Sequence, residues 1–330
     1  MNGPAAMNGP VAGQATEEQM QLALDYPAMD KASIEGVTPP QTASPAGAAG
    51  PEVPAVPAVP ARPPISAVSS TLRIPLAARA LGDALFPEMA AADAYAGRAL
   101  EALGDDGQQW LSDRHSVYGV LARTRRFREL AADYLRGRPD GHIVNLGCGL
   151  SHYVQWLDNG QATMTDADLP EVLALRRALL PAPAERYSLK ELDLTAANWW
   201  DGLGLPAARS GAPVFLFSEG VLMYLQPREV DAVLATFGER APAGSLFAFD
   251  AICWLAAGRA KRHPSIRHTE AQFHWGPRKL ADLLRPQPRL KLYAIHRIME
   301  GYGLPYSLFA PVFRALTGVP FYALYVLSVS

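Results

Sequence analysis

A pair of glycines directly after an apolar run is the first feature of the chain that could do chemistry. The run His142 to Leu146 has the character of a buried strand and continues into Gly147, Cys148 and Gly149. Glycines at such a turn let the backbone approach a ligand closely. The pattern predicts a nucleotide-type cofactor, although a G-x-G turn alone serves NAD, FAD or S-adenosylmethionine, or is only a turn.

The residues beyond the glycines argue against a dinucleotide. The G-x-G-x-x-G fingerprint requires a third glycine where this chain has His152. Roughly twenty residues after the glycines, Asp168 closes the segment TDAD, where a carboxylate can hold a ribose diol. We prefer Asp168 to Asp166 as the residue that holds the ribose. The alternative is that Asp168 only caps a helix ahead of Leu169. The spacing indicates a ligand that contains adenosine, but it does not distinguish NAD from S-adenosylmethionine.

The elements that position these residues can be read from apolar periodicity. Seven short apolar runs alternate with helical stretches: HIVNLGCG, ATMTDAD, YSLKELDL, PVFLFSEG, SLFAFDAI, LKLYAIH and ALYVLSV. They predict an α/β fold with a Rossmann-like, seven-stranded, doubly wound sheet over residues 141–330. Residues 66–140 carry apolar positions at threes and fours, which predict two or three helices that cover the active site. Residues 1–65 are rich in Ala, Pro, Gly and Val and predict a disordered tail.

Composition excludes several classes of partner. The 330 residues include 30 basic and 32 acidic side chains, so no strong field favours nucleic acid or an anionic membrane. The two cysteines, Cys148 and Cys253, form neither a metal-ligand spacing nor a disulfide framework, so we expect no metal and a cytoplasmic protein. The apolar C-terminal stretch from Leu308 to Ser330 ends in FYALYVLSVS, which predicts a strand rather than a membrane anchor.

Five segments in a fixed order carry a resemblance to a known family. They are the Arg123-Thr124-Arg125 triplet, VNLGCGL, DLPEVLALRRALLP, LDLTAANWWDGL and SEGVLMYLQPREV. Together they resemble the leucine carboxyl methyltransferase superfamily, and most closely its bacterial branch of tetracenomycin-type polyketide O-methyltransferases. The segment TLRIPLAARALGDALFPEMAAADAYA resembles the helical cover of that family. The resemblance implies a class I fold and S-adenosylmethionine as the cofactor.

The resemblance also assigns a role to each matching residue. It implies that Arg123 takes the methionine carboxylate, which a planar guanidinium can bind through two hydrogen bonds. Gly147 and Gly149 would let the backbone lie along the methionine portion. Asp168 would hold the ribose hydroxyls. Arg123 could instead be one more solvated arginine of the run RTRRFR.

Two further segments complete the implied cofactor site. Asp193 and the backbone of Leu194 would bind the adenine amino group, and the alternative for Asp193 is a helix cap. Glu219 ends the fourth strand, where a carboxylate faces the ligand crevice and complements the cationic methionine end. A buried Glu without a partner would be costly, which favours this role over a core position.

Contacts to the methyl acceptor are less well defined. Tyr224 could touch the acceptor or simply pack in its helix. Many relatives carry an Asp-Thr-Arg-like stretch where this chain has Ser151, His152 and Tyr153, so acceptor specificity stays open. His152 could act as a base or acceptor contact, although a lone His at a helix start is more often structural. Arg128 stands where relatives tend to have an acid.

The reaction that follows from this reading is methyl transfer to oxygen of a small molecule. A carboxylate acceptor is ionised at neutral pH and needs no base, whereas a phenol would gain from one. Because no unmistakable base appears, we expect a methyl ester of a polyketide-type secondary metabolite. The alternatives are a phenol or hydroxyl O-methyltransferase, a nicotinamide oxidoreductase, and a catalytically silent S-adenosylmethionine-binding protein.

Overall fold

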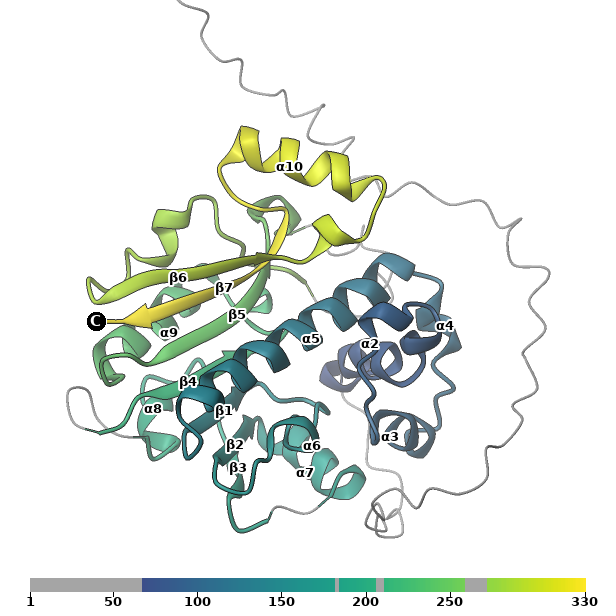
Figure 1. The fold of residues 1–330 in the computed structure, drawn as a ribbon, viewed down its shortest axis with the longest axis horizontal. Helices are drawn as coiled ribbons and strands as arrows, with labels where there is room; N and C mark the ends of the chain where they lie inside the picture. Colours follow the sequence, from purple (N-terminus) through teal and green to yellow (C-terminus); the bar gives the residue numbers. More distant parts are fainter. Residues whose placement is uncertain (1–66, 182–183, 206–210, 259–271) are drawn as a thin grey trace, which may run out of the picture. The chain divides into compact units, whose positions relative to one another are not determined.

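A mixed seven-stranded sheet forms the centre of the structure (Figure 1). The computed structural model describes residues 67–181, 184–205, 211–258 and 272–330. The strand order is β3-β2-β1-β4-β5-β7-β6, and β7 alone runs antiparallel to its two neighbours. This order confirms the predicted Rossmann-like, seven-stranded sheet.

The strands coincide with the seven predicted apolar runs. Their bounds are β1 (His142–Leu146), β2 (Thr163–Asp168), β3 (Tyr187–Glu191), β4 (Val214–Ser218), β5 (Leu246–Ile252), β6 (Leu290–Arg297) and β7 (Tyr322–Val329). The predicted C-terminal strand is confirmed as β7. It is buried between β5 and β6, and this burial explains why the sequence here is continuously apolar.

The helices stand before, between and after these strands. Their bounds are α2 (Ala67–Leu81), α3 (Ala96–Ala102), α4 (Gln108–Leu111), α5 (Arg114–Gly137), α6 (Val154–Leu157), α7 (Pro170–Leu179), α8 (Trp199–Gly202), α9 (Pro227–Arg240) and α10 (Tyr306–Thr317). Short 3-10 turns include η4 (Leu222–Tyr224) and η9 (Met299–Gly301).

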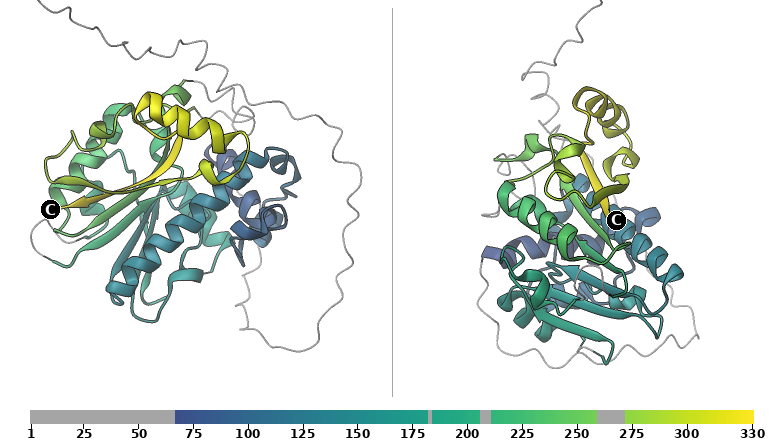
Figure 2. Two further views of the ribbon diagram at one scale, coloured as in Figure 1. Left: turned by 45° about the horizontal axis from the view of Figure 1, so that its top comes forward. Right: turned by 90° about the vertical axis from the view of Figure 1, so that its left-hand side faces the viewer.

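The long helix α5 lies on one face of the sheet (Figures 1 and 2). Alternate β4 residues point to this face: Phe217 packs on Phe127 of α5 and Phe215 on Tyr134, each pair with ring centroids 5.5 Å apart. The other face of the sheet packs against α9, where Phe237 contacts Phe247 of β5. The sheet is thus covered by helices on both faces, as its apolar strands require.

The helices that precede β1 differ from the prediction in number and in one starting point. Four helices, α2 to α5, stand where two or three were predicted. The periodicity of AAADAYAGRALEAL predicts a helix from residue 90, whereas α3 begins at Ala96. Asp93 instead forms a turn ahead of the helix, because its carboxylate accepts hydrogen bonds from the backbone N–H groups of Tyr95 and Ala96. The predicted tail, residues 1–65, lies outside the described residues.

Candidate active site

The predicted cofactor residues gather at one edge of the sheet. Strands β1 to β5 are parallel, so their carboxyl ends meet at this edge. The glycine loop follows β1, Asp168 ends β2, Asp193 follows β3 and Glu219 follows β4. A ligand crevice at the carboxyl ends of the strands is the general arrangement of open α/β sheets. Helix α5 brings Arg123 to the same edge.

The loop after β1 is a tight turn that requires its first glycine. Gly147 has φ +69°, and a Cβ on it would collide with the side chain of Val221. The backbone N–H groups of Gly147 and Cys148 both donate to the carbonyl of Ala167 at the end of β2, at 2.8 and 3.1 Å. The loop is therefore fixed against β2 and packs on the segment that follows β4.

Two buried arginines hold the carbonyl groups that come next in this loop. Arg176 of α7 donates to the carbonyls of Gly149 and Ser151, at 3.0 and 2.6 Å. Arg79 of α2 donates to the carbonyl of Leu150 at 3.1 Å. Because these carbonyls are bound from both sides, the loop has little freedom to rearrange.

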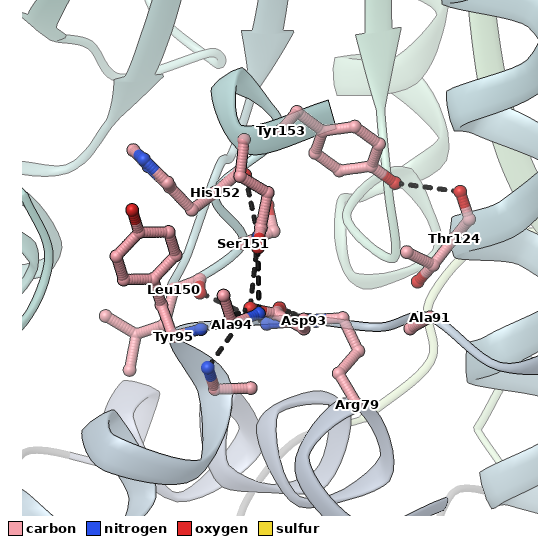
Figure 3. A network of polar contacts seen from close by, with 12 residues as sticks. Arg79, Ala91, Asp93, Ala94, Tyr95, Thr124, Leu150, Ser151, His152 and Tyr153 are labelled. Carbon is pink, nitrogen blue, oxygen red and sulfur yellow. Dashed lines mark hydrogen bonds and ion pairs between the residues drawn. The ribbon is translucent and has the colours of Figure 1, made fainter. Parts of the chain in front are cut away.

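Arg79 also connects the helices before β1 to the loop. Its Nε lies 2.9 Å from Asp93, and both side chains are almost fully buried. The Asp93 carboxylate accepts a further hydrogen bond, at 3.0 Å, from Gln155 just beyond the loop. Figure 3 shows this network between the segment that carries Asp93 and the loop that carries Ser151 and His152.

The two aspartates of β2 occupy different environments. Asp166 is fully buried and paired with Arg176 and with the hydroxyl of Tyr187. Asp168 instead lies beside the loop and accepts hydrogen bonds from the N–H groups of Gly149 and Leu169, at 2.7 and 2.8 Å. Burial outweighs these donors and raises the pKa of Asp168. Of the two carboxylates, Asp168 is the one placed at the crevice.

Arg123 forms the centre of a buried ion-pair network. Its Nε donates to Glu219 at 3.0 Å, and its Nη1 donates to Asp250 at 3.3 Å and to the hydroxyl of Tyr322 at 3.2 Å. Burial lowers the pKa of the guanidinium, but its anionic partners raise it well above the ordinary value. In the part of the chain that the structure describes, Nη2 has no hydrogen-bond partner. A ligand carboxylate can therefore bind Nη2 without displacing a protein partner of Arg123.

Glu219 is fully engaged by protein donors. Oε1 accepts from Arg123 and from the hydroxyl of Thr124 at 2.8 Å, and Oε2 accepts from the hydroxyl of Tyr153 at 2.6 Å. Burial alone would raise the pKa of this carboxyl. The charges of Arg123 and Arg79 and the two hydroxyl donors outweigh burial and hold the pKa below its ordinary value. Glu219 is therefore an anion at neutral pH, with a solvent-free environment that is nonetheless satisfied.

Sequence reasoning missed part of this network. Asp250 had a weak signal, since it is a polar residue near the end of the buried run SLFAFDAI. Tyr322 had none, because it stands 199 residues after Arg123 in an apolar C-terminal run. Thr124 and Tyr153 were quoted only as parts of motifs. Chain topology rather than local pattern brings these side chains to Arg123.

The adenine-binding prediction falls on a more open segment. The side chain of Asp193 is exposed, and its Oδ1 accepts from the backbone and hydroxyl of Thr195, at 2.8 and 2.6 Å. Leu194 beside it is buried. Asp193 thus closes a local turn with Thr195 and does not cap a helix, because α8 begins only at Trp199, and its exposed position leaves acceptor capacity for a ligand.

The two predicted acceptor contacts lie in unlike surroundings. Tyr224 stacks obliquely on Phe273 at 5.3 Å, and burial raises the pKa of its phenol to about 12. His152 is only 4% exposed, packed edge-on against Tyr95 at 4.8 Å and near Tyr187. Burial and then the charge of a neighbouring arginine lower the pKa of His152 to about 4. This enclosed position argues against direct contact between His152 and an acceptor.

Three buried arginines balance the carboxylates at this edge of the sheet. Arg123 is paired with Glu219 and Asp250, while the charge of Arg79 acts on Glu219 and that of Arg176 acts on Asp168. Among the described residues, no group of His, Cys, Asp or Glu is arranged to hold a metal ion. No helix in the described ranges is both long and apolar enough to cross a bilayer.

Relatives of the chain are consistent with this geometry. Tetracenomycin polyketide synthesis O-methyltransferase TcmP of Streptomyces glaucescens is 29% identical over 220 residues, which cover 66% of this chain and 78% of the relative. A putative S-adenosyl-L-methionine-dependent methyltransferase of Mycolicibacterium vanbaalenii is 29% identical over 142 residues, which cover 40% of this chain and 45% of that protein.

Structure comparison supports the fold independently. A putative methyltransferase from Thermobifida fusca superposes with a TM-score of 0.50 at 16% identity, over 78% of this chain and 94% of the other. The leucine carboxyl methyltransferase family matches residues 65–238, which is just over half of the chain. The chain therefore belongs to the leucine carboxyl methyltransferase family and is an S-adenosylmethionine-dependent methyltransferase.

Proposed function

We propose that the protein methylates a carboxylate oxygen of a small, polyketide-type metabolite to give a methyl ester. The observation that supports this choice is the protonation state of the two candidate acceptor contacts. With a pKa of about 12, Tyr224 keeps its proton at neutral pH, and His152, with a pKa of about 4, is a weak and enclosed base. Neither suits the deprotonation of a phenol, whereas a carboxylic acid with a pKa near 4 is already ionised.

The cofactor site is proposed to use the residues at the carboxyl edge of the sheet. When bound, S-adenosylmethionine supplies a methyl carbon that its sulfonium activates. Nη2 of Arg123 would bind the methionine carboxylate, because it is the atom of the guanidinium without a described partner. Asp168 would accept from the ribose hydroxyls, since each carboxylate oxygen keeps acceptor capacity beside its backbone donor. Asp193 and the backbone of Leu194 would bind the adenine.

Glu219 is proposed to act through its charge rather than through direct contact. Its oxygens already accept from Arg123, Thr124 and Tyr153. An ionised carboxylate held in this way would stabilise the cationic end of a bound cofactor through its charge. The glycine loop, fixed by Arg79 and Arg176, would set where the methionine portion lies.

The chemical step needs little from the protein beyond alignment. S-adenosylmethionine, held by Arg123, Asp168 and Asp193, would supply its methyl group to the acceptor oxygen, with a C–O bond formed as the C–S bond is broken. The products are the ester and neutral S-adenosylhomocysteine, and no proton is transferred. The residues listed above would therefore act by orienting the reactants and excluding water. Helices α2 to α5, within the predicted range 66–140, are proposed to cover the reacting groups.

A labelling experiment tests the proposal. The protein is incubated with methyl-labelled S-adenosylmethionine and an extract of the organism that produces it, and the labelled product is isolated and identified by mass spectrometry. We expect mild base to release the label as methanol, as it does from an ester. A label that withstands base would instead show an ether and favour the alternative, a phenol or hydroxyl O-methyltransferase.

A further inference from the structure

Asp250 and Tyr322 bind Arg123 but have no part in the roles proposed above. We propose that they are positioning residues, which hold the guanidinium of Arg123 so that Nη2 is the atom presented to the amino-acid portion of the cofactor. The inference rests on the proposed role of Arg123. It extends the cofactor site to β7, a strand that contributes none of the predicted cofactor residues.

The hydroxyl of Tyr322 connects the two charges. It donates to Oδ2 of Asp250 at 2.6 Å and accepts from Nη1 of Arg123 at 3.2 Å. Nη1 also lies 3.3 Å from the same Oδ2. Nη1 thus bonds to two acceptors that the Tyr322 hydroxyl joins to each other, and the single hydrogen of that hydroxyl is directed to Asp250.

Asp250 holds the backbone against which the guanidinium lies. Its Oδ1 accepts from the N–H of Gly220 at 2.6 Å. A Cβ on Gly220 would lie 2.8 to 3.1 Å from Nη2, Cζ and Nη1 of Arg123, so the guanidinium lies flat against this glycine. One carboxylate thus fixes both the cation and the turn beneath it.

Tyr322 is itself held in place by packing. It begins β7 and pairs with Ile252 of β5, and its side chain is almost fully buried. Helix α5 approaches the ring at Gly119, where a Cβ would be 3.6 Å from Cε1. Gly119 stands one helical turn before Arg123, so the same helix packs on the tyrosine and carries the arginine. An acceptor fixed in this way costs no further side-chain entropy when a ligand binds.

The network also prevents a competing geometry. Arginine and carboxylate prefer a two-pronged pair. Without Asp250 and Tyr322 on Nη1, the guanidinium of Arg123 is free to turn onto Glu219 and to withdraw Nη2 from the crevice. The consequence is specific, because only a ligand with a carboxylate near Nη2 loses an interaction.

Two ligands and a matched pair of variants separate this role from a general effect on folding. S-adenosylhomocysteine carries the amino-acid portion, and 5′-methylthioadenosine lacks it. Tyr322→Phe removes the bridging hydroxyl. Tyr325→Phe, three residues along the same strand, removes a buried hydroxyl that has no hydrogen-bond partner in the described chain. Binding of both ligands to the parent, both variants and Arg123→Ala is measured by calorimetry.

We expect Tyr322→Phe to bind S-adenosylhomocysteine about tenfold more weakly than the parent, which corresponds to the loss of one hydrogen bond to a charged group. Its affinity for 5′-methylthioadenosine should change by less than about twofold, and Tyr325→Phe should match the parent with both ligands. Equal losses for both ligands would overturn the inference, because they indicate a structural role. A second result would also overturn the inference: Tyr322→Phe keeps the parent's ratio of affinities for the two ligands, although Arg123→Ala has lost its preference for S-adenosylhomocysteine.

The proposed function fails in a different way. If the parent itself binds S-adenosylhomocysteine no better than 5′-methylthioadenosine, the role of Arg123 is wrong, whatever the variants do. Should Tyr322→Phe not fold, Asp250→Asn tests the same connection, since an amide keeps an acceptor for Gly220 and loses the charge that holds Nη1. Its loss should again be confined to S-adenosylhomocysteine, and a loss shared by both ligands would contradict the inference.

Discussion

The hydroxyl of Tyr153 donates a 2.6 Å hydrogen bond to Oε2 of Glu219, and both side chains are almost completely buried. Tyr153 belongs to the stretch Ser151-His152-Tyr153, in which the chain departs from the Asp-Thr-Arg-like pattern of many relatives. In this protein a neutral phenol thus supplies one of the donors that satisfy the buried carboxylate.

Replacing Tyr153 by Phe should destabilise the fold. The change leaves Oε2 of Glu219 without its described donor, and loss of a hydrogen bond to a buried charged group costs about 1 to 3 kcal/mol. Urea titration measures the free energy of unfolding of each protein. Tyr293→Phe on the exposed edge strand β6 is the control and should stay within about 0.5 kcal/mol of the parent. Equal effects of the two changes would show that Glu219 does not depend on Tyr153.

His152 should make stability depend on pH below neutrality. Its pKa is about 4 in the folded protein against an ordinary value of 6.5, so the unfolded chain binds the extra proton between these values. The stability that the neutral His152 ring allows is present in full above pH 6.5, and it is lost as the pH falls toward 4. Between pH 7 and 4.5, the unfolding free energy of the parent should fall by about 2 kcal/mol more than that of His152→Gln.

Parallel urea titrations of the two proteins at several pH values provide the measurement, and contributions of other groups cancel in the difference. An NMR titration of the His152 ring is an independent check, with its midpoint expected near pH 4. A midpoint near 6.5 would mean that the ring is solvated and that the enclosed geometry is wrong.

Gly220 should be required for cofactor binding as well as for its backbone conformation. Gly220 and Gly204 have nearly the same positive φ, +69° and +68°, but a Cβ on Gly204 meets no atom within 4 Å. Substitution by Ala at either site should cost on the order of 1 kcal/mol of stability through strain. Only Gly220→Ala should also displace Arg123 and lower the affinity for S-adenosylhomocysteine, by at least about fivefold in calorimetry. Equal affinities in the two variants would refute the contact with Arg123.

Deleting residues 1–60 should leave the fold and the cofactor affinity intact. The prediction comes from composition, because a segment dominated by Ala, Pro, Gly and Val has little with which to form a core. Thermal melts of the full-length and shortened proteins provide the comparison, together with titration of S-adenosylhomocysteine. A large drop in melting temperature would mean that the segment packs on the rest of the protein.

The sequence predicted the sheet well because each strand is a short apolar run bounded by polar or turn residues. The run YALYVLSV, for example, is continuous because β7 is central and covered on both faces. The start of α3 was misplaced for a local reason. Ala90 to Ala92 continue a helical periodicity, but the carboxylate of Asp93 holds a turn there, and such a turn can be recognised only once its backbone donors are placed.

The candidate site was predictable only where its residues lie in motifs. Gly147 and Asp168 stand directly at strand ends, so their common edge follows from a parallel sheet. The partners of Arg123 could not be derived in the same way. Asp250 and Tyr322 meet it only because β7 inserts antiparallel beside β5, and no pattern within either segment records that neighbour.

The central claim is that Arg123 and Asp168 bind the cofactor at the carboxyl edge of the sheet. Its most direct test is titration of S-adenosylhomocysteine into four folded variants. Arg123→Ala should lose about 2 to 4 kcal/mol of binding free energy, and Asp168→Ala about 1 to 3 kcal/mol, through lost charge-assisted hydrogen bonds. Tyr224→Phe and His152→Ala should bind nearly as the parent does.

Arg123→Ala also leaves Glu219 and Asp250 without their cation, so each variant is first shown to be folded by circular dichroism at the titration temperature. Arg123→Lys, which keeps the charge but not the planar donors, should fall between Ala and the parent. Folded Arg123→Ala should bind at least tenfold more weakly than the parent, and Tyr224→Phe should lose almost no affinity. If folded Arg123→Ala binds S-adenosylhomocysteine as tightly as the parent, the assignment of the cofactor site is contradicted.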